Sequence, residues 1–201
     1  MEAEFSSERD EMQMATLAHG GAAATPRSAS TVKAATGTTA ATASRYVFAG
    51  VRIALGWVFL WAFLDKLFGL GHETAQNAAW VNGGSPTSGF LGHAATGPFQ
   101  DMYNNIAGAG WADWLFMLGL LGIGVALIAG IGMRIAAAAG ALLLVLMWTA
   151  VLPPENNPFM DDHLIYAGTL VGLALTQAGN TVGLGKWWSG TALVKKAPWL
   201  K

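Results

Sequence analysis

The sequence predicts an all-α integral membrane protein, a bundle of four helices that follows a disordered N-terminal tail. Composition is the first observation: 53% of the 201 residues are hydrophobic and only 11% are charged, as is typical of membrane proteins. Length is the second, because several apolar stretches reach the roughly 20 helical residues that cross a hydrocarbon layer of ~30 Å. The third is that lysine and arginine are missing from residues 67–133 and 135–185.

The tail covers residues 1–45 and begins with five acidic side chains, followed by a stretch rich in alanine, threonine, serine and glycine. Such a segment cannot bury a core, so we expect it to be disordered. A cleaved signal peptide fits poorly because the first apolar run starts only at residue 46. The first span is therefore expected to remain in the mature protein.

The first span, residues 47–68, carries Arg52 inside and the pair Asp65 and Lys66 at its far end. Its valine, isoleucine, leucine and phenylalanine residues each favour insertion by about 0.3–0.6 kcal/mol, and together they outweigh the cost of about 3 kcal/mol for one central arginine. A charge retained in a span faces protein or water.

The connection over residues 71–112 is too polar to cross the membrane. Within it, Pro98 can start a helix, and the apolar residues Phe99, Met102, Tyr103 and Ile106 recur at helical spacing. This spacing predicts an amphipathic helix over residues 98–107 at the membrane surface or over the mouth of the bundle. The alternative is an ordered loop with chance periodicity.

Three further spans are predicted over residues 113–133, 135–152 and 162–179, which completes a bundle over residues 46–188. The few residues around Arg134 allow only a tight turn, and Pro153 with Pro154 ends the third span. A basic tail over residues 189–201 follows. Small residues at four-residue spacing predict close helix contacts, although alanine and glycine are common throughout the chain; they are Gly122, Ala126, Gly130, Ala136, Gly140, Gly168 and Gly172.

Orientation follows from the positive-inside rule. The connections over residues 71–112 and 153–161 contain no lysine or arginine, whereas Arg45, Arg134 and the C-terminal lysines fall on the other side. Both termini are therefore expected in the cytoplasm, as in a multi-pass protein of a bacterial plasma membrane.

Several classes of function are excluded or disfavoured. The chain has no cysteine, which removes thiolate nucleophiles, cysteine-held zinc and iron–sulfur clusters. A net charge of −1 without a basic run disfavours nucleic acid as a partner. No haem, flavin or metal motif is evident, because His72, His93 and His163 are scattered.

Polar residues converge on the predicted outer side, at the end of the first span and the start of the fourth. We expect His163 with Asp161 and Asp162 to be catalytic, since a histidine between carboxylates can shuttle protons near neutral pH. Lys66, with Asp65 and Asn157, is expected to bind the substrate. The alternative is structural: the aspartates cap the fourth helix, and Lys66 extends to the lipid headgroups.

One face of the first span carries Arg52, Phe59 and Phe63 in line with Lys66, about 21 Å from Arg52 along the helix. We expect this face to bind a flat apolar ring such as a quinone, the alternative being that the aromatic rings simply pack in the core.

The order of these features resembles the DoxX/DoxD family of small four-span bacterial membrane proteins. The similar stretches are RIALGWVFLW with its charged pair over residues 52–66, WVNG over residues 80–83, and NNPFMDDHLIY over residues 156–166. The family includes the large, DoxD-type subunit of thiosulfate:quinone oxidoreductase. The resemblance implies a subunit that couples oxidation of thiosulfate, or a related small sulfur compound, to reduction of a membrane quinone, together with a second subunit. A non-catalytic accessory subunit of a respiratory or other membrane complex is the alternative, while a solute carrier is disfavoured because no inverted repeat is visible.

Overall fold

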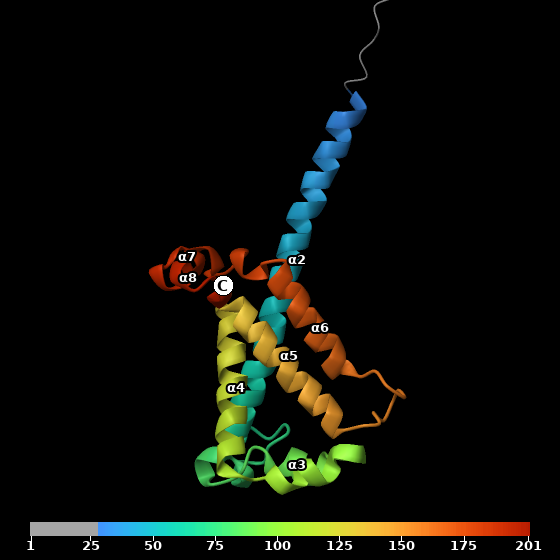
Figure 1. Ribbon diagram of the computed structural model, residues 1–201, viewed down its shortest axis with the longest axis vertical. Coiled ribbons are helices and arrows are strands. Elements are labelled where there is room, and N and C mark those ends of the chain that lie inside the picture. The colour runs from blue at the N-terminus through green and yellow to red at the C-terminus, as the bar shows by residue number, and fades with distance from the viewer. Residues whose placement is uncertain (1–27) are drawn as a thin grey trace, which may run out of the picture. The chain divides into compact units, whose positions relative to one another are not determined.

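The computed structural model describes residues 28–201, with side chains from residue 38 onward. Residues 42–201 form one compact unit. Four long helices, coloured from blue to orange in Figure 1, dominate the described part: α2 (Ser28–Phe68), α4 (Gly110–Ala129), α5 (Met133–Ala150) and α6 (Asp162–Leu175). No strand occurs within residues 28–201, which confirms the predicted all-α class.

Among the described residues, three helical segments are long and apolar enough to cross a membrane: Thr38–Phe68, Gly110–Ala129 and Met133–Ala150. The fourth predicted span, residues 162–179, is a shorter apolar helix of 14 residues, about 21 Å long. It ends early because Gln177 has a positive φ of 52°, a conformation that no α-helix continues.

Helix α2 begins well before the predicted first span. Of the tail expected to be disordered over residues 1–45, residues 1–27 lie outside the described part, whereas residues 28–45 are helical. Alanine is the best helix former, and extension of an existing helix avoids a new nucleation cost.

Short elements fill both connections. Between α2 and α4 lie η1 (Gln76–Ala78), η2 (Trp80–Asn82), η3 (Phe90–Ala94), η4 (Gly97–Phe99) and α3 (Gln100–Ile106). After α6 follow η5 (Ala178–Asn180), α7 (Gly185–Gly190), α8 (Ala192–Lys196) and η6 (Pro198–Leu200). Helix α3 lies inside the segment 98–107 for which the spacing predicts a helix, and its Tyr103 is buried while Asn104 and Asn105 are exposed.

The core is formed by one face of each long helix. Helix α5 packs against both α4 and α6, and the buried side chains come from all four helices; among them are Leu55, Phe59, Met117, Leu120, Ile123, Leu127, Leu144, Leu170 and Leu173. Gly140 of α5 allows close contact with α6, because a Cβ there would lie 2.7 Å from Leu170 Cδ1.

Glycines also set the contact between α2 and α4. A Cβ at Gly124 would lie 2.8 Å from the amide nitrogen of Leu60, and a Cβ at Gly56 would lie 2.8 Å from Ile128 Cγ1. Gly122, a member of the small-residue series seen in the sequence, is exposed and has nothing within 4 Å of such a Cβ. The close approach therefore uses the glycine two residues further along α4.

Arg52 is fully buried where α4 ends. Its Nη1 donates to the carbonyl oxygens of Leu127 (2.5 Å) and Ile128 (3.2 Å), and its Nη2 donates to Val182 (2.6 Å) and Thr181 (3.4 Å). None of the ion pairs among the described side chains includes Arg52. The partial negative charge at the C-terminus of α4 complements the guanidinium instead, so Arg52 joins α2, α4 and the segment after α6.

Replacing Arg52 by methionine should lower the stability of the bundle by about 2–4 kcal/mol, because buried carbonyl oxygens lose their donors. Thermal unfolding of the detergent-solubilised protein, followed by circular dichroism, measures the change. The matched control is Arg45→Met on the same helix, whose side chain is exposed. Equal melting temperatures for the two variants would show that the buried hydrogen bonds of Arg52 contribute nothing.

Gly124→Val should separate α2 from α4, because the added side chain meets the backbone of Leu60, which cannot move aside. We expect a loss of about 1–3 kcal/mol, typical of an overpacked contact. Gly122→Val on the same helix has open space and should melt within a few degrees of the wild type. A Gly122→Val variant as unstable as Gly124→Val would attribute the effect to helix propensity alone.

Candidate functional site

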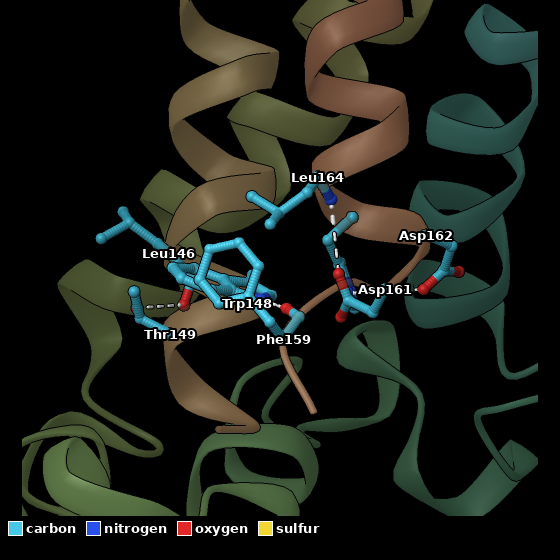
Figure 2. Close-up of polar contacts among 8 residues, drawn as sticks. Leu146, Trp148, Thr149, Phe159, Asp161, Asp162 and Leu164 are labelled. Carbon is cyan, nitrogen blue, oxygen red and sulfur yellow. Dashed lines mark hydrogen bonds and ion pairs between the residues drawn. The ribbon is translucent and has the colours of Figure 1, made fainter. Parts of the chain in front are cut away.

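The N-terminus of α6 brings together the predicted catalytic residues, and Figure 2 labels two of them, Asp161 and Asp162. Asp161 is the N-cap of the helix, and its Oδ1 accepts a hydrogen bond of 3.3 Å from the amide of Leu164. Its Oδ2 lies 2.7 Å from His163 Nδ1. The side chains of Asp161 and His163 are only 14% and 19% exposed, so the cap also holds a largely buried imidazole.

Asp162 completes this cluster from the solvent side. Its Oδ1 lies 3.6 Å from His163 Nδ1, and its side chain is 69% exposed. Because Nδ1 faces two carboxylates, the neutral ring carries its proton there and leaves Nε2 as the acceptor. The arrangement can therefore take up and release a proton at Nε2.

The same three residues form the one group of potential metal ligands found among the described residues, with ligand atoms within 4.8 Å of one another. Both oxygens of Asp161 already accept hydrogen bonds, from Leu164 and from His163. A cation would have to displace these bonds to gain Asp161 as a ligand, which favours proton transfer over metal binding at this cluster.

Asn157 shapes the loop that leads into α6. Its Oδ1 accepts from the amides of Phe159 (3.0 Å) and Met160 (2.9 Å). Trp148 near the end of α5 donates from Nε1 to the carbonyl of Phe159 at 2.9 Å, and the two rings meet edge to face at 5.2 Å (Figure 2). The side-chain carbonyl of Asn157 is thus used within the loop.

Asp65 and Lys66 bind the loop that follows α2. Asp65 is 2% exposed, and its carboxylate accepts from the amides of His72 (3.3 Å) and Glu73 (3.1 Å). Lys66 Nζ lies 4.0 Å from Glu73 Oε2, and this is the ion pair that the structure records for it. No ion pair joins Lys66 to Asp161 or Asp162 within the described residues.

Arg52, Phe59 and Phe63 do not join this cluster. Arg52 precedes Asp65 by 13 residues of one helix, about 20 Å, and lies at the opposite end of the bundle beside the last residues of α4. Phe59 is buried in the core, and Phe63 packs against that core.

Asp113 is a buried acidic position that the sequence analysis did not single out. It is buried in the first turn of α4, where its Oδ1 accepts from Ser85 Oγ (2.9 Å), Thr87 N (3.0 Å) and Thr87 Oγ1 (2.6 Å). An acid at the start of an otherwise apolar span was the available signal. Through these hydrogen bonds Asp113 anchors the long connection between α2 and α4 to the bundle, as Asp65 does at the end of α2.

An apolar groove of about 420 Å³ lies on α4 and α5 and reaches α3 and the loop before it. Its lining includes Phe90, Tyr103, Leu115, Gly119, Leu142 and Leu146, and no residue of α2. Leu115 and Leu142 are 67% and 61% exposed, so the groove opens on the surface that faces lipid.

A hydroxyl pair borders the groove. Tyr103 Oη lies 2.5 Å from Thr149 Oγ1 and donates to the carbonyl of Leu146 at 3.0 Å. Leu146 and Thr149 lie on the last turns of α5, as does Trp148, which contacts the loop leading to Asp161 (Figure 2). The groove and the His163 cluster therefore adjoin the same end of α5.

Comparison with curated proteins and with solved structures gives no match. The DoxX family model matches residues 47–153, which is more than half of the chain. This range contains Arg52, Asp65, Lys66 and Asp113 and ends before Asn157. The chain therefore belongs to the DoxX family of membrane proteins.

Proposed function

We propose that the protein is the membrane subunit of a quinone-linked oxidoreductase that acts on thiosulfate or a related small sulfur compound. The observation that supports this most is the hydrogen bond of 2.7 Å between Asp161 and His163 at the polar end of the bundle. This bond holds the imidazole of His163, whose Nε2 can exchange protons, near the end of α5. The apolar groove reaches the same end of α5.

The chemistry needs such a group. Oxidation of thiosulfate joins two anions through a new sulfur–sulfur bond and releases two electrons. A quinone that accepts them also takes up two protons to become a quinol. His163 supplies protons from Nε2 and takes up new protons from water, while Asp161 holds the ring in position through its hydrogen bond to Nδ1.

The apolar groove fits the proposed quinone better than the face of α2 does. Its volume of about 420 Å³ lies in the range of small-molecule sites, about 300–1,000 Å³. A quinone can enter it sideways from the bilayer, and Tyr103 and Thr149 provide hydroxyl groups at one edge. Phe59 and Phe63, by contrast, are engaged in the core.

The sulfur anion needs positive charge, and Lys66 is the candidate at this end of the bundle. Its side chain is 16% exposed, while Glu73, at 4.0 Å, is 85% exposed and free to move into water. Asp161 and Asp162 repel an anion and are assigned to positioning His163. Because the chain has no cysteine to carry sulfur covalently, we include a second protein subunit in the proposal.

We further propose that the protein lies in a bacterial plasma membrane with both termini in the cytoplasm. The residues between 67 and 133 and between 135 and 185 contain no lysine or arginine, which by the positive-inside rule directs the His163 end outward.

One observation favours the alternative of a non-catalytic accessory subunit. Asp65 and Asn157 were both expected to contact substrate. Their side-chain oxygens instead accept hydrogen bonds from backbone amides of neighbouring loop residues. A protein that is purified without quinone and shows no activity with its partner would fit this alternative.

His163→Ala should lower the turnover number by roughly 10²–10⁴-fold with little change in substrate affinity, because it removes a proton-transfer group. Lys66→Ala should instead raise KM for thiosulfate roughly 10- to 100-fold, as expected for a lost charge-assisted contact. The assay is thiosulfate-dependent reduction of a quinone analogue in membranes that contain the protein and its co-purifying partner.

His93→Ala is the matched control, since His93 is an exposed histidine of the same side of the bundle and should leave both constants unchanged. Full activity of the His163 and Lys66 variants, or no activity of the wild type with its partner present, would support the accessory role.

Gly119→Phe should fill the groove, since a Cβ at Gly119 meets nothing within 4 Å and the residue lines the groove. We expect at least roughly tenfold less co-purified quinone, because the ring loses its apolar contacts. Gly168→Phe on α6 has the same open space outside the groove and should keep its quinone. Equal quinone content in both variants would remove the groove from the proposal.

A further inference from the structure

A second pocket, of about 300 Å³, lies at the other end of the bundle. It is formed where α4 ends, α5 begins and α6 ends, and it is covered by α7 and the C-terminal residues. Three cationic residues line it, Arg134, Lys186 and Lys201, together with the polar side chains of Gln177, Asn180 and Ser189. None of the residues that line it is acidic.

Among the residues that line the pocket, no acidic side chain compensates the positive charge of Arg134, Lys186 and Lys201. After Asp162 the sequence contains no aspartate or glutamate up to Lys201. The ion pairs among the described side chains involve Lys66 and His163 and none of the three cationic residues of the pocket. An anion can therefore bind there without displacing an acidic side chain from the lining of the pocket.

The pocket is a built structure because its cover is fixed by hydrogen bonds. Arg134 donates from its amide to the main-chain oxygen of Lys201 at 2.8 Å and from Nη1 to the Pro198 carbonyl at 3.2 Å. Trp188 Nε1 donates to the Leu200 carbonyl at 2.7 Å. Val194 of α8 is fully buried. Because Arg134 uses one side-chain donor in this way, most of its five N–H groups remain for a ligand.

The surroundings of the pocket are those of a membrane interface. It lies between the ends of two membrane-crossing segments, Gly110–Ala129 and Met133–Ala150. The covering segment exposes Trp187 and Trp199, each at 65%, and Leu193 at 57%. Tryptophan rings beside lysines are typical of segments at the headgroup level of a bilayer. A ligand held here has its charged part in the pocket and apolar neighbours beside it.

We propose that this pocket binds the phosphate headgroup of an anionic phospholipid such as phosphatidylglycerol. Arg134 and Lys186 contact the phosphate oxygens, and the amide groups of Gln177 and Asn180 contact the headgroup hydroxyls. The acyl chains leave along the apolar surface of the helices. The lipid then fastens the C-terminal segment to the start of α5, independently of any oxidoreductase activity.

The experiment uses the full-length protein in detergent and counts retained lipid by native mass spectrometry during titration with phosphatidylglycerol. The double variant Lys186→Gln/Lys201→Gln should bind at least roughly tenfold more weakly, since two cationic contacts near the headgroup are lost. Lys195→Gln/Lys196→Gln is the matched control: it removes the same charge from exposed residues of α8 outside the pocket and should bind within about twofold of the wild type.

Two further arms identify the ligand. Phosphatidylcholine should not compete, and glycerol 3-phosphate at equal concentration should displace little lipid. Equal loss of binding in the two double variants would overturn the proposal in favour of diffuse charge attraction. Full displacement by glycerol 3-phosphate would overturn it in favour of a soluble anion, and competition by phosphatidylcholine in favour of acyl-chain binding alone.

Discussion

The buried guanidinium of Arg52 is the interaction on which the bundle depends. A lone positive charge inside a membrane protein is costly, and here four backbone carbonyl oxygens compensate it. Two belong to the last residues of α4 and two to the segment after α6. The arginine therefore fixes which helix ends meet, and it requires the glycines around it: a Cβ at Gly130 would lie 2.5 Å from Nη1, and one at Gly183 would lie 3.0 Å from Nη2.

The two ends of the bundle differ in charge and in how they are held. At one end, the buried carboxylates of Asp65 and Asp113 accept hydrogen bonds from the long connection between α2 and α4, and His163 lies between two further carboxylates. At the other end, Arg52 donates hydrogen bonds to the segment after α6. The sequence from residue 163 to residue 201 contains no acidic side chain. The first end is suited to the proton transfer that we propose, and the second end is suited to the binding of an anionic lipid.

The sequence was sufficient to predict the four long helices, because apolar length and proline positions act locally. It did not give all of their bounds, since α2 begins earlier and α6 ends earlier than predicted. It also placed Asp161, Asp162 and His163 together, since three consecutive residues at a helix start cannot lie far apart. It could not reveal the partners of Arg52, which come from residues 75 to 130 positions away, nor the pairing of Lys66 with Glu73 across a loop. The small-residue spacing was informative only in part, because the contacting glycine, Gly124, differs from the exposed Gly122 by a helix rotation that spacing alone does not fix.

The same limit applies to the apolar groove. Its lining residues come from α3, α4, α5 and the loop before α3, and only tertiary packing brings them together. In contrast, the aromatic face of α2 that we expected to bind a quinone packs into the core. Helix periodicity identifies a face that is buried, but it does not distinguish a face in the core from a face in a binding site.

Our central proposal on topology is that the end with His163 faces outward and the basic end faces the cytoplasm. Because the chain has no cysteine, single cysteines at the exposed positions Asn77 and Lys196 report the two ends directly when intact cells are treated with a membrane-impermeant maleimide. The account predicts labelling of Asn77→Cys in intact cells and labelling of Lys196→Cys only after permeabilisation. Labelling of Lys196→Cys in intact cells, with Asn77→Cys protected, would contradict it.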